Sequence, residues 1–212
     1  MAYHNNNREF KGRSLVGFPQ DFCVVDIETT GLSPSNDSII EIGAIMYEDG
    51  KAVDSFASLL QPRVNEMGDY VSPFITSLTG ITNEMLDAAP PSERVLNEFF
   101  DFLGDSIIVG YNVNFDVNFL YDKILDFLGE YMTNDYIDIM RLAKKLYPDM
   151  THHRLSDMTA RFGIINKNAH RALSDVEATY ACLCEFRTEA EIKHGDADEF
   201  LKLFPKKSIL CQ

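Results

Sequence analysis

Long apolar runs, paired cysteines and an excess of basic residues are all missing from this sequence. No uninterrupted apolar run approaches the ~18 residues that a membrane-spanning helix needs, so we expect no contact with a membrane. The polar N-terminal stretch MAYHNNNREFKGRSLVG has no continuous apolar core, so we expect neither a signal peptide nor an anchor. The four cysteines show neither CxxC spacing nor histidine partners at zinc-ligand distances, so we expect unpaired core thiols in a reducing cytoplasm.

Basic residues are too few to balance the acidic ones. The chain has 33 Asp and Glu against 19 Lys and Arg, for a formal net charge of −14. This balance argues against a surface that binds duplex nucleic acid through extensive phosphate neutralisation. It leaves room for an enzyme that holds only a short strand end, because divalent cations in the site would reduce the need for Lys or Arg.

Internal repeats and linkers rich in Gly, Ser or Pro are also absent, which predicts one domain. Extended segments alternate with helical patterns after an initial hairpin, whose turn is marked by Asp49-Gly50. We therefore predict an α/β fold in which a mixed sheet, with three antiparallel strands and then parallel strands, is flanked by helices. The expected strands are 22–29, 38–48, 51–60, 106–112 and a short one near 136–138.

The ends of the chain differ in character from its middle. Residues 1–17 read as a flexible lead, although Leu15 and Val16 could pack. Residues 18–190 hold the predicted domain. Residues 191–212 form a weakly helical tail that we expect to pack on the domain rather than dock a partner.

Two carboxylates interrupt an apolar strand in the stretch FCVVDIETTGL, residues 22–32. Because side chains alternate across a strand, Asp26 and Glu28 should leave the same face about 7 Å apart. Burial of unpaired carboxylates is unfavourable without a cation or hydrogen bonds. A solvated face or pairing with Arg or Lys would also explain them, but apolar neighbours on both faces favour a cation site.

Such a site needs ligands from elsewhere in the chain. Asp116 follows an apolar strand at the start of a helix, where α/β sheets collect their sites and where an aspartate can also act as a helix cap. Asp175 lies on a helix, and an ideal helix would put His170 about 140° away from it. His170 must therefore lie on the preceding loop to reach the same centre. A set of oxygen ligands favours Mg²⁺ or Mn²⁺ over zinc.

Three segments resemble, in order, the motifs of a known nuclease superfamily. VVDIETTGL, VGYNVNFDVNFL and HRALSDVEATY are similar to the exonuclease motifs of the DEDD superfamily, in the DEDDh subgroup whose third motif carries His. They most resemble the proofreading exonucleases of bacterial replicative DNA polymerases, namely the polymerase III epsilon subunit and the exonuclease module of Gram-positive polymerase III. With LTGITNEML and YPDMTHHRLSDMTARFGI, the similarity runs from about residue 20 to residue 187.

This resemblance implies a ribonuclease H-like fold and stepwise 3′→5′ hydrolysis that releases nucleoside monophosphates. The positions that match the family's four acids and its general base are Asp26, Glu28, Asp116, Asp175 and His170. Tyr111 stands where many relatives have His, a departure that lies outside these five chemical residues.

The implied chemistry uses two Mg²⁺ or Mn²⁺ ions ~4 Å apart on the scissile phosphate. Asp26 would bridge both ions, Glu28 and Asp175 would complete the shell of the first, and Asp116 would hold the second through water. The neutral imidazole of His170 would take the proton of the attacking water. Residues expected around the terminal nucleotide, with turn formation or core packing as the alternative, are Thr29, Thr30, Gly31, Leu32, Asn112 and Phe115.

The expected substrate is a single-stranded 3′ end of DNA, and a DNA polymerase subunit is a candidate protein partner in proofreading, with stand-alone repair as the other setting. Two rival interpretations stay open at this point. One is an exoribonuclease that trims RNA ends, because contacts to the 2′-OH are not visible in a sequence. The other is a catalytically silent nucleic-acid-binding module that retains the fold, although such a module has no need for a repulsive cluster of carboxylates.

Overall fold

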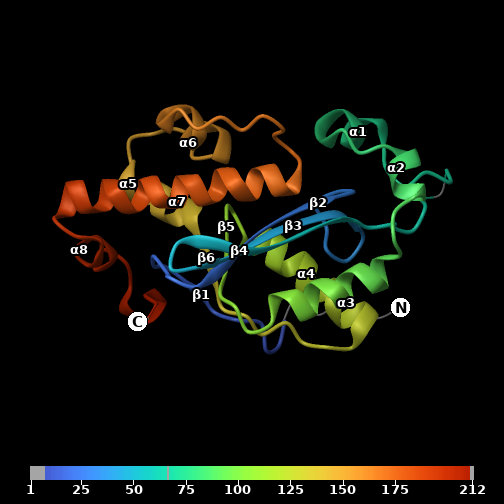
Figure 1. Cartoon of the computed structure of the whole chain (residues 1–212), viewed down its shortest axis with the longest axis horizontal. Helices are drawn as coiled ribbons and strands as arrows, with labels where there is room; N and C mark the ends of the chain where they lie inside the picture. Colours follow the sequence, from blue (N-terminus) through green and yellow to red (C-terminus); the bar gives the residue numbers. More distant parts are fainter. Residues whose placement is uncertain (1–7, 66, 211–212) are drawn as a thin grey trace.

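A six-stranded mixed sheet forms the centre of the molecule (Figure 1). The computed structural model describes residues 8–65 and 67–210. The strands are β1 (Ser14–Leu15), β2 (Phe22–Thr29), β3 (Ile39–Glu48), β4 (Lys51–Leu59), β5 (Ile108–Gly110) and β6 (Tyr136–Asp138). The helices are α1 (Pro73–Thr79), α2 (Asn83–Asp87), α3 (Ser92–Leu103), α4 (Asn114–Leu128), α5 (Ile139–Leu146), α6 (Leu155–Phe162), α7 (Ala172–His194), α8 (Ala197–Leu201) and the 3₁₀ turn η1 (Lys206–Ser208).

The strand order is β1-β6-β5-β2-β3-β4. β2, β3 and β4 pair antiparallel, whereas β5, β6 and β1 join in parallel beside β2. The β3–β4 turn is the predicted hairpin, and both of its central residues, Asp49 and Gly50, adopt positive φ angles, as a tight hairpin turn requires. The predicted mixed sheet of antiparallel and then parallel strands is confirmed. β5 is shorter than the strand predicted for 106–112.

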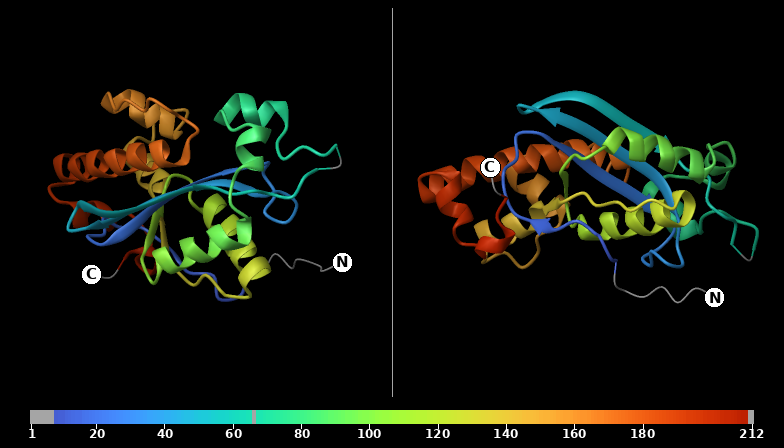
Figure 2. Two further views of the ribbon diagram at one scale, coloured as in Figure 1. Left: turned by 45° about the vertical axis from the view of Figure 1, so that its right-hand side comes forward. Right: turned by 90° about the horizontal axis from the view of Figure 1, so that it is seen from below.

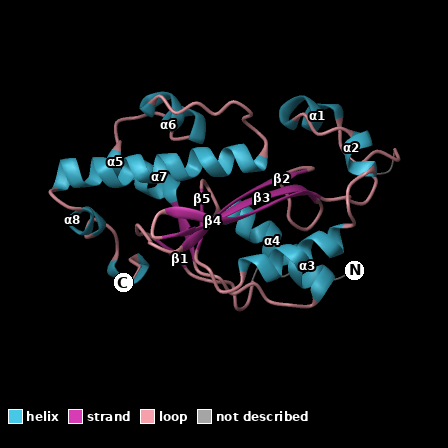
Figure 3. Cartoon of the chain, viewed as in Figure 1, coloured by secondary structure: helices cyan, strands magenta, loops and turns pink. Residues whose placement is uncertain are grey.

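Helices cover both faces of this sheet (Figures 2 and 3). α7 lies along one face over β2 and β3, with α5 and α6 beside it, and α3 and α4 lie against the other face. The alternation of β2 follows these layers, since Phe22 and Val24 join the core under α7 while Cys23, Val25 and Ile27 join the core under α3 and α4. By the same alternation, the side chains of Asp26 and Glu28 lie on the α7 side of β2.

Gly43 on β3 lets the first turn of α7 approach the sheet closely. A Cβ atom at this position would lie 2.5 Å from the backbone nitrogen of Leu173 and 2.6 Å from the carbonyl carbon of Ala172. Gly43 is also the register partner of Asp26 on β2. The absence of a side chain at this one position thus sets the distance between α7 and the carboxylate-bearing strand.

The two terminal segments pack on each other and on the sheet. Residues 8–17, which the sequence predicts as flexible, include β1 and bury Leu15 and Val16. Val16 donates its N–H to Ser208 O and accepts a hydrogen bond from Leu210 N, so the tail extends this edge. Phe200 of α8 is buried in the same core. Residues 1–7 of the predicted lead and residues 211–212 of the tail lie outside the described residues.

The two edges of the sheet are built differently. At the β1 edge, the Arg141 guanidinium donates to Leu15 O over 3.1 Å. β4 forms the other edge, and most of its side chains are exposed. The register of β3 with β4 shifts at Val53, which leaves a bulge in the outer strand. β4 therefore presents the open edge of the sheet.

Two smaller features concern the cysteines and the length of the helices. Cys23 and Cys182 are buried, as expected for core thiols, whereas Cys184 is exposed; Cys211 lies outside the described residues. Among the described helices, none has both the length and the apolar character needed to cross a bilayer.

Candidate metal centre

The start of α7 brings His170 and Asp175 to the carboxylates of β2. His170 lies on the loop two residues before the helix and adopts a left-handed φ of +64°. Its backbone N–H donates to Asp175 Oδ2 over 3.0 Å, and the Asn166 side-chain amide donates to the other oxygen of Asp175. The loop thus folds back over the first turn of α7. His170 occupies the loop position that the helical spacing predicts, and its side chain is exposed.

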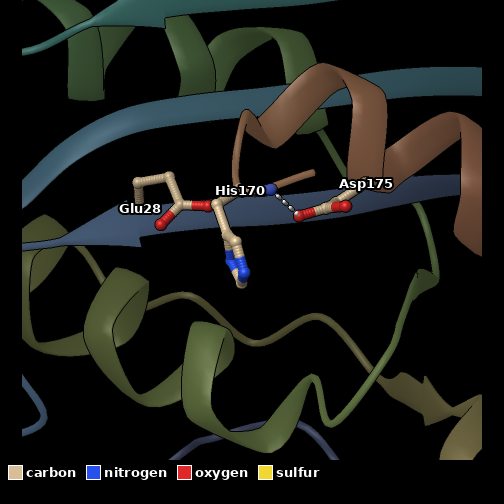
Figure 4. Close-up of side chains that lie close together, drawn as sticks. All are labelled: Glu28, His170 and Asp175. Carbon is tan, nitrogen blue, oxygen red and sulfur yellow. Dashed lines mark hydrogen bonds between the residues drawn. The ribbon is translucent and has the colours of Figure 1, made fainter. Parts of the chain in front are cut away.

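Glu28, His170 and Asp175 form a compact cluster (Figure 4). One candidate ligand atom from each residue lies within 4.8 Å of the others. The three side chains come from the end of β2, the loop before α7 and the first turn of α7, elements far apart in the sequence.

Asp116 reaches the same region from the other layer. It lies in the first turn of α4, is buried, and its Oδ1 accepts the backbone N–H of Ile27 over 3.1 Å. β5 pairs with β2 only at Cys23 and Val24, so this carboxylate takes over a β2 amide beyond the end of the parallel ladder. Asp116 is thereby held next to the backbone between Asp26 and Glu28.

The acids raise one another's pKa values. Burial, followed by the charges of Asp116, Asp175, Glu28 and Glu41, raises the pKa of Asp26 well above its ordinary value. Burial, followed by Asp175 and Glu41, raises the pKa of Glu28 to about 8, and the Arg171 guanidinium opposes this shift.

Burial also raises the pKa of Asp116, although its backbone hydrogen bonds oppose the shift. Full ionisation of these acids is therefore unfavourable without a positively charged partner. A divalent cation would be such a partner, and the oxygen donors with one imidazole fit Mg²⁺ or Mn²⁺.

Two further buried acids were missed in the sequence. Glu41 on β3 is the register partner of Glu28 and forms an ion pair with Arg171, with Nη2 2.7 Å from Oε1. Asp138 ends β6 and accepts the N–H of Asn112 over 2.9 Å. The signal for Glu41 was present, because it is a lone carboxylate in the apolar run IIEIGAI, the same pattern that singled out Asp26.

The residues predicted around the nucleotide divide into two groups. Thr29 is buried and its hydroxyl donates to Gly31 O, so it shapes the turn after β2. Thr30 accepts the N–H of Ser38 through its hydroxyl and belongs to the same turn. Leu32, in contrast, is 85% exposed at the tip of this loop.

The opposite wall shows a similar division. Asn112 is exposed with a left-handed φ of +59°, while Phe115 is half-buried and packs against Phe119 with ring centroids 4.8 Å apart. Tyr111, the departure from many relatives, donates its hydroxyl to His153 O over 2.6 Å and ties the end of β5 to the loop before α6.

Comparison with known proteins assigns the chain to a family. The family model RNase_T, described as exonuclease, matches residues 23–183, which include all the acids above and His170. The chain belongs to this exonuclease family. Among curated relatives, it is 41% identical over 162 residues to DNA polymerase III PolC-type of Clostridium perfringens, covering 76% of this chain and 11% of that protein. It is 39% identical over 168 residues to the PolC-type polymerase of Caldanaerobacter subterraneus, covering 79% of this chain and 12% of that protein.

The exonuclease chain thus spans about a ninth to an eighth of the length of these relatives. Solved structures agree on the fold. Exonuclease I superposes with a TM-score of 0.68 at 20% identity, over 87% of this chain and 43% of that one. E. coli exonuclease I in complex with a dA16 oligonucleotide superposes with a TM-score of 0.66 at 22% identity, over 88% of this chain and 46% of that one. The fold is the ribonuclease H-like fold of these exonucleases.

Proposed function

We propose that this domain is a metal-dependent 3′→5′ exonuclease that removes nucleoside monophosphates from DNA ends. The observation that carries the proposal is the cluster formed by Glu28, His170 and Asp175, with Asp116 hydrogen-bonded to the strand between Asp26 and Glu28. Membership of the exonuclease family supports the same chemistry.

The acids would hold two Mg²⁺ or Mn²⁺ ions. Asp26 directly precedes Ile27, whose N–H is accepted by Asp116, and it shares the α7 side of β2 with Glu28. It is therefore the carboxylate best placed to be shared, with Glu28 and Asp175 on one ion and Asp116 on the other. When bound, such ions supply Lewis-acid activation of water and stabilise the leaving 3′ oxygen.

His170 would act as the general base. Its backbone is fixed by Asp175, but its exposed imidazole projects from a loop beside the carboxylates. A ring nitrogen there can accept the proton of an attacking water. His170 lies on a loop and the proposed metal ligands lie on β2, α4 and α7, so proton transfer and metal binding would fall to different residues.

The loop after β2 would hold the terminal nucleotide. Its turn is built by Thr29, Thr30 and Gly31, and the exposed Leu32 side chain would pack against the terminal base. Asn112, with Phe115 behind it, would line the opposite wall. Oligonucleotide complexes of exonuclease I support a single-stranded 3′ end as the substrate. The PolC-type relatives support proofreading beside a polymerase in the cytoplasm as its setting.

The test is a time course of Asp26→Ala and wild type on 3′-labelled single-stranded DNA, matched duplex, mismatched duplex and RNA. We expect Mg²⁺-dependent release of mononucleotides by the wild type and its loss in Asp26→Ala, with circular dichroism unchanged. Asp54→Ala, which removes an exposed carboxylate from β4, is the matched control and should keep wild-type activity. Nuclease activity in Asp26→Ala would contradict the metal role, and digestion of RNA but not DNA would reassign the substrate.

A further inference from the structure

Glu41 is a buried acid beside the proposed metal centre whose oxygens are already engaged by the protein. Glu41 as a whole is 8% exposed to solvent. Oε1 accepts from Arg171 Nη2 over 2.7 Å and from Nε over 3.0 Å, while Oε2 accepts the backbone N–H of Ala172 over 3.0 Å. Both oxygens are thus committed to the start of α7, and the Arg171 guanidinium already balances the charge of this carboxylate.

Arg171 resolves an electrostatic conflict within the sheet. Glu41 faces Glu28 directly across the β2–β3 ladder, and like charges in that position repel. The Arg171 guanidinium neutralises Glu41 through a charge-assisted pair, and the N-terminal end of a helix adds a favourable N–H. Because the Glu41 side chain is nearly buried, removal of the guanidinium would leave an uncompensated carboxylate, which is unfavourable.

The pair also determines where the neighbouring residues lie. Arg171 stands directly after His170, and its carbonyl accepts the N–H of Asp175 over 3.1 Å. Its side chain ties this turn to β3 two residues before Gly43, where the helix backbone comes close to the strand. One ion pair and one missing side chain thus fix the first turn of α7 against the sheet.

We propose that Glu41 and Arg171 are positioning residues for the exonuclease reaction: they clamp the start of α7 so that His170 and Asp175 face Glu28. The inference rests on the proposed function and deepens it. Neither residue touches the reacting atoms. The clamp acts on the geometry of His170 and Asp175, and its loss should slow turnover more than it weakens binding of the DNA end.

Steady-state kinetics of Glu41→Gln, Arg171→Gln and the double variant on 3′-labelled single-stranded DNA test the clamp. Misplacement of a catalytic group by about 1 Å can lower a rate about 100-fold, so we expect each single variant to lower kcat about 10- to 100-fold with KM within about 3-fold. Because the two residues act as one unit, the double variant should match the slower single variant. Arg171→Lys should recover part of kcat. Arg187→Gln, which breaks the Arg187–Glu191 pair farther along α7, should leave kcat unchanged.

A double-mutant cycle between Arg171 and His170 tests whether the clamp acts through the histidine. The single-turnover rate is measured with and without Arg171→Gln, both in the wild type and in a His170→Ala variant. Arg171→Gln should lower the rate by a much smaller factor in the His170→Ala variant than in the wild type. Single variants with kcat within 2-fold of the wild type, effects confined to KM, or equal costs in both backgrounds would overturn the inference. If the wild type itself shows no Mg²⁺-dependent activity, the proposed function fails instead, so the two failures are distinguishable. Melting temperatures identify any variant that does not fold, in which case Arg171→Lys decides the matter.

Discussion

At the scale of the residue, the carboxylates of the proposed metal centre raise one another's pKa values. Glu28 follows the alternating apolar residues of β2, and the negative charges of Asp175 and Glu41 raise its pKa. Its pKa of about 8 lies far above the ordinary value of 4.5 mainly because the side chain is buried. Without a cation, the folded protein therefore retains a proton that the unfolded chain releases.

This retained proton predicts a stability that falls with pH in the absence of metal. Because the folded pKa of Glu28 is raised, its favourable contribution is complete below pH 4.5 and is lost as the pH rises through about 8. Between these values the slope is at most about 1.4 kcal/mol per pH unit for one group. Thermal melts in EDTA should show this decline, and Mg²⁺ should restore stability at pH 8. Glu28→Gln should flatten the decline, and an equally steep decline in that variant would contradict the assignment.

At the scale of the element, the first turn of α7 and the loop before it bring Asp175 and His170 to Glu28. The first turn supplies Asp175, begins two residues after His170, and contacts β3 where Gly43 has no side chain. These positions depend on one helix lying at one height above the sheet. A change of packing there should alter catalysis without removing any chemical group.

Gly43→Ala tests this dependence on packing. The added Cβ would lie 2.5 Å from Leu173 N, a backbone atom that cannot rotate away, so the helix must shift. We expect a loss of about 1–3 kcal/mol in unfolding free energy and a fall of at least about 10-fold in kcat. Gly17→Ala crowds the Leu210 side chain at 2.9 Å far along the sheet and serves as the control, with stability lowered but kcat retained. A wild-type kcat in Gly43→Ala would show that the helix height is not critical.

At the scale of the whole molecule, the terminal segments close the core on the side of β1. Val16 is hydrogen-bonded to the tail, and Phe200 packs near Phe18 with ring centroids 6.4 Å apart. We expect this closure to serve stability rather than the site, because α8 follows the C-terminal end of α7, whereas Asp175 lies in its first turn (Figure 1).

Phe200→Ala should therefore destabilise the fold while sparing the chemistry. Removal of a fully buried Phe side chain costs about 3–5 kcal/mol of unfolding free energy. Chemical denaturation would measure this loss, and kcat measured well below the melting temperature should stay within 2-fold of the wild type. Leu203→Ala, at an exposed position in the same segment, is the control. A selective loss of kcat in Phe200→Ala would link the tail to the site.

Much of the architecture could be predicted because its signals are local. Alternation placed Asp26 and Glu28 on one face, the Asp49-Gly50 pair predicted the hairpin, and helical spacing put His170 on a loop. Contacts between distant segments could not be read in this way. β1 is two residues long and exists only because it meets β6, and the Glu41–Arg171 pair joins positions 130 residues apart. A single sequence carries no signal for such pairings.

The exposed strand β4 affects whether a strand of another chain can pair with the edge of this sheet. Unpaired strand edges invite a neighbouring chain to add on, and natural sheets discourage this with charges and bulges. β4 carries both, in the exposed Lys51 and Asp54 and in the bulge at Val53. An incoming strand would have to strip water from two charged side chains and accommodate an irregular backbone, so intermolecular β-sheet growth is disfavoured where the sheet stays open.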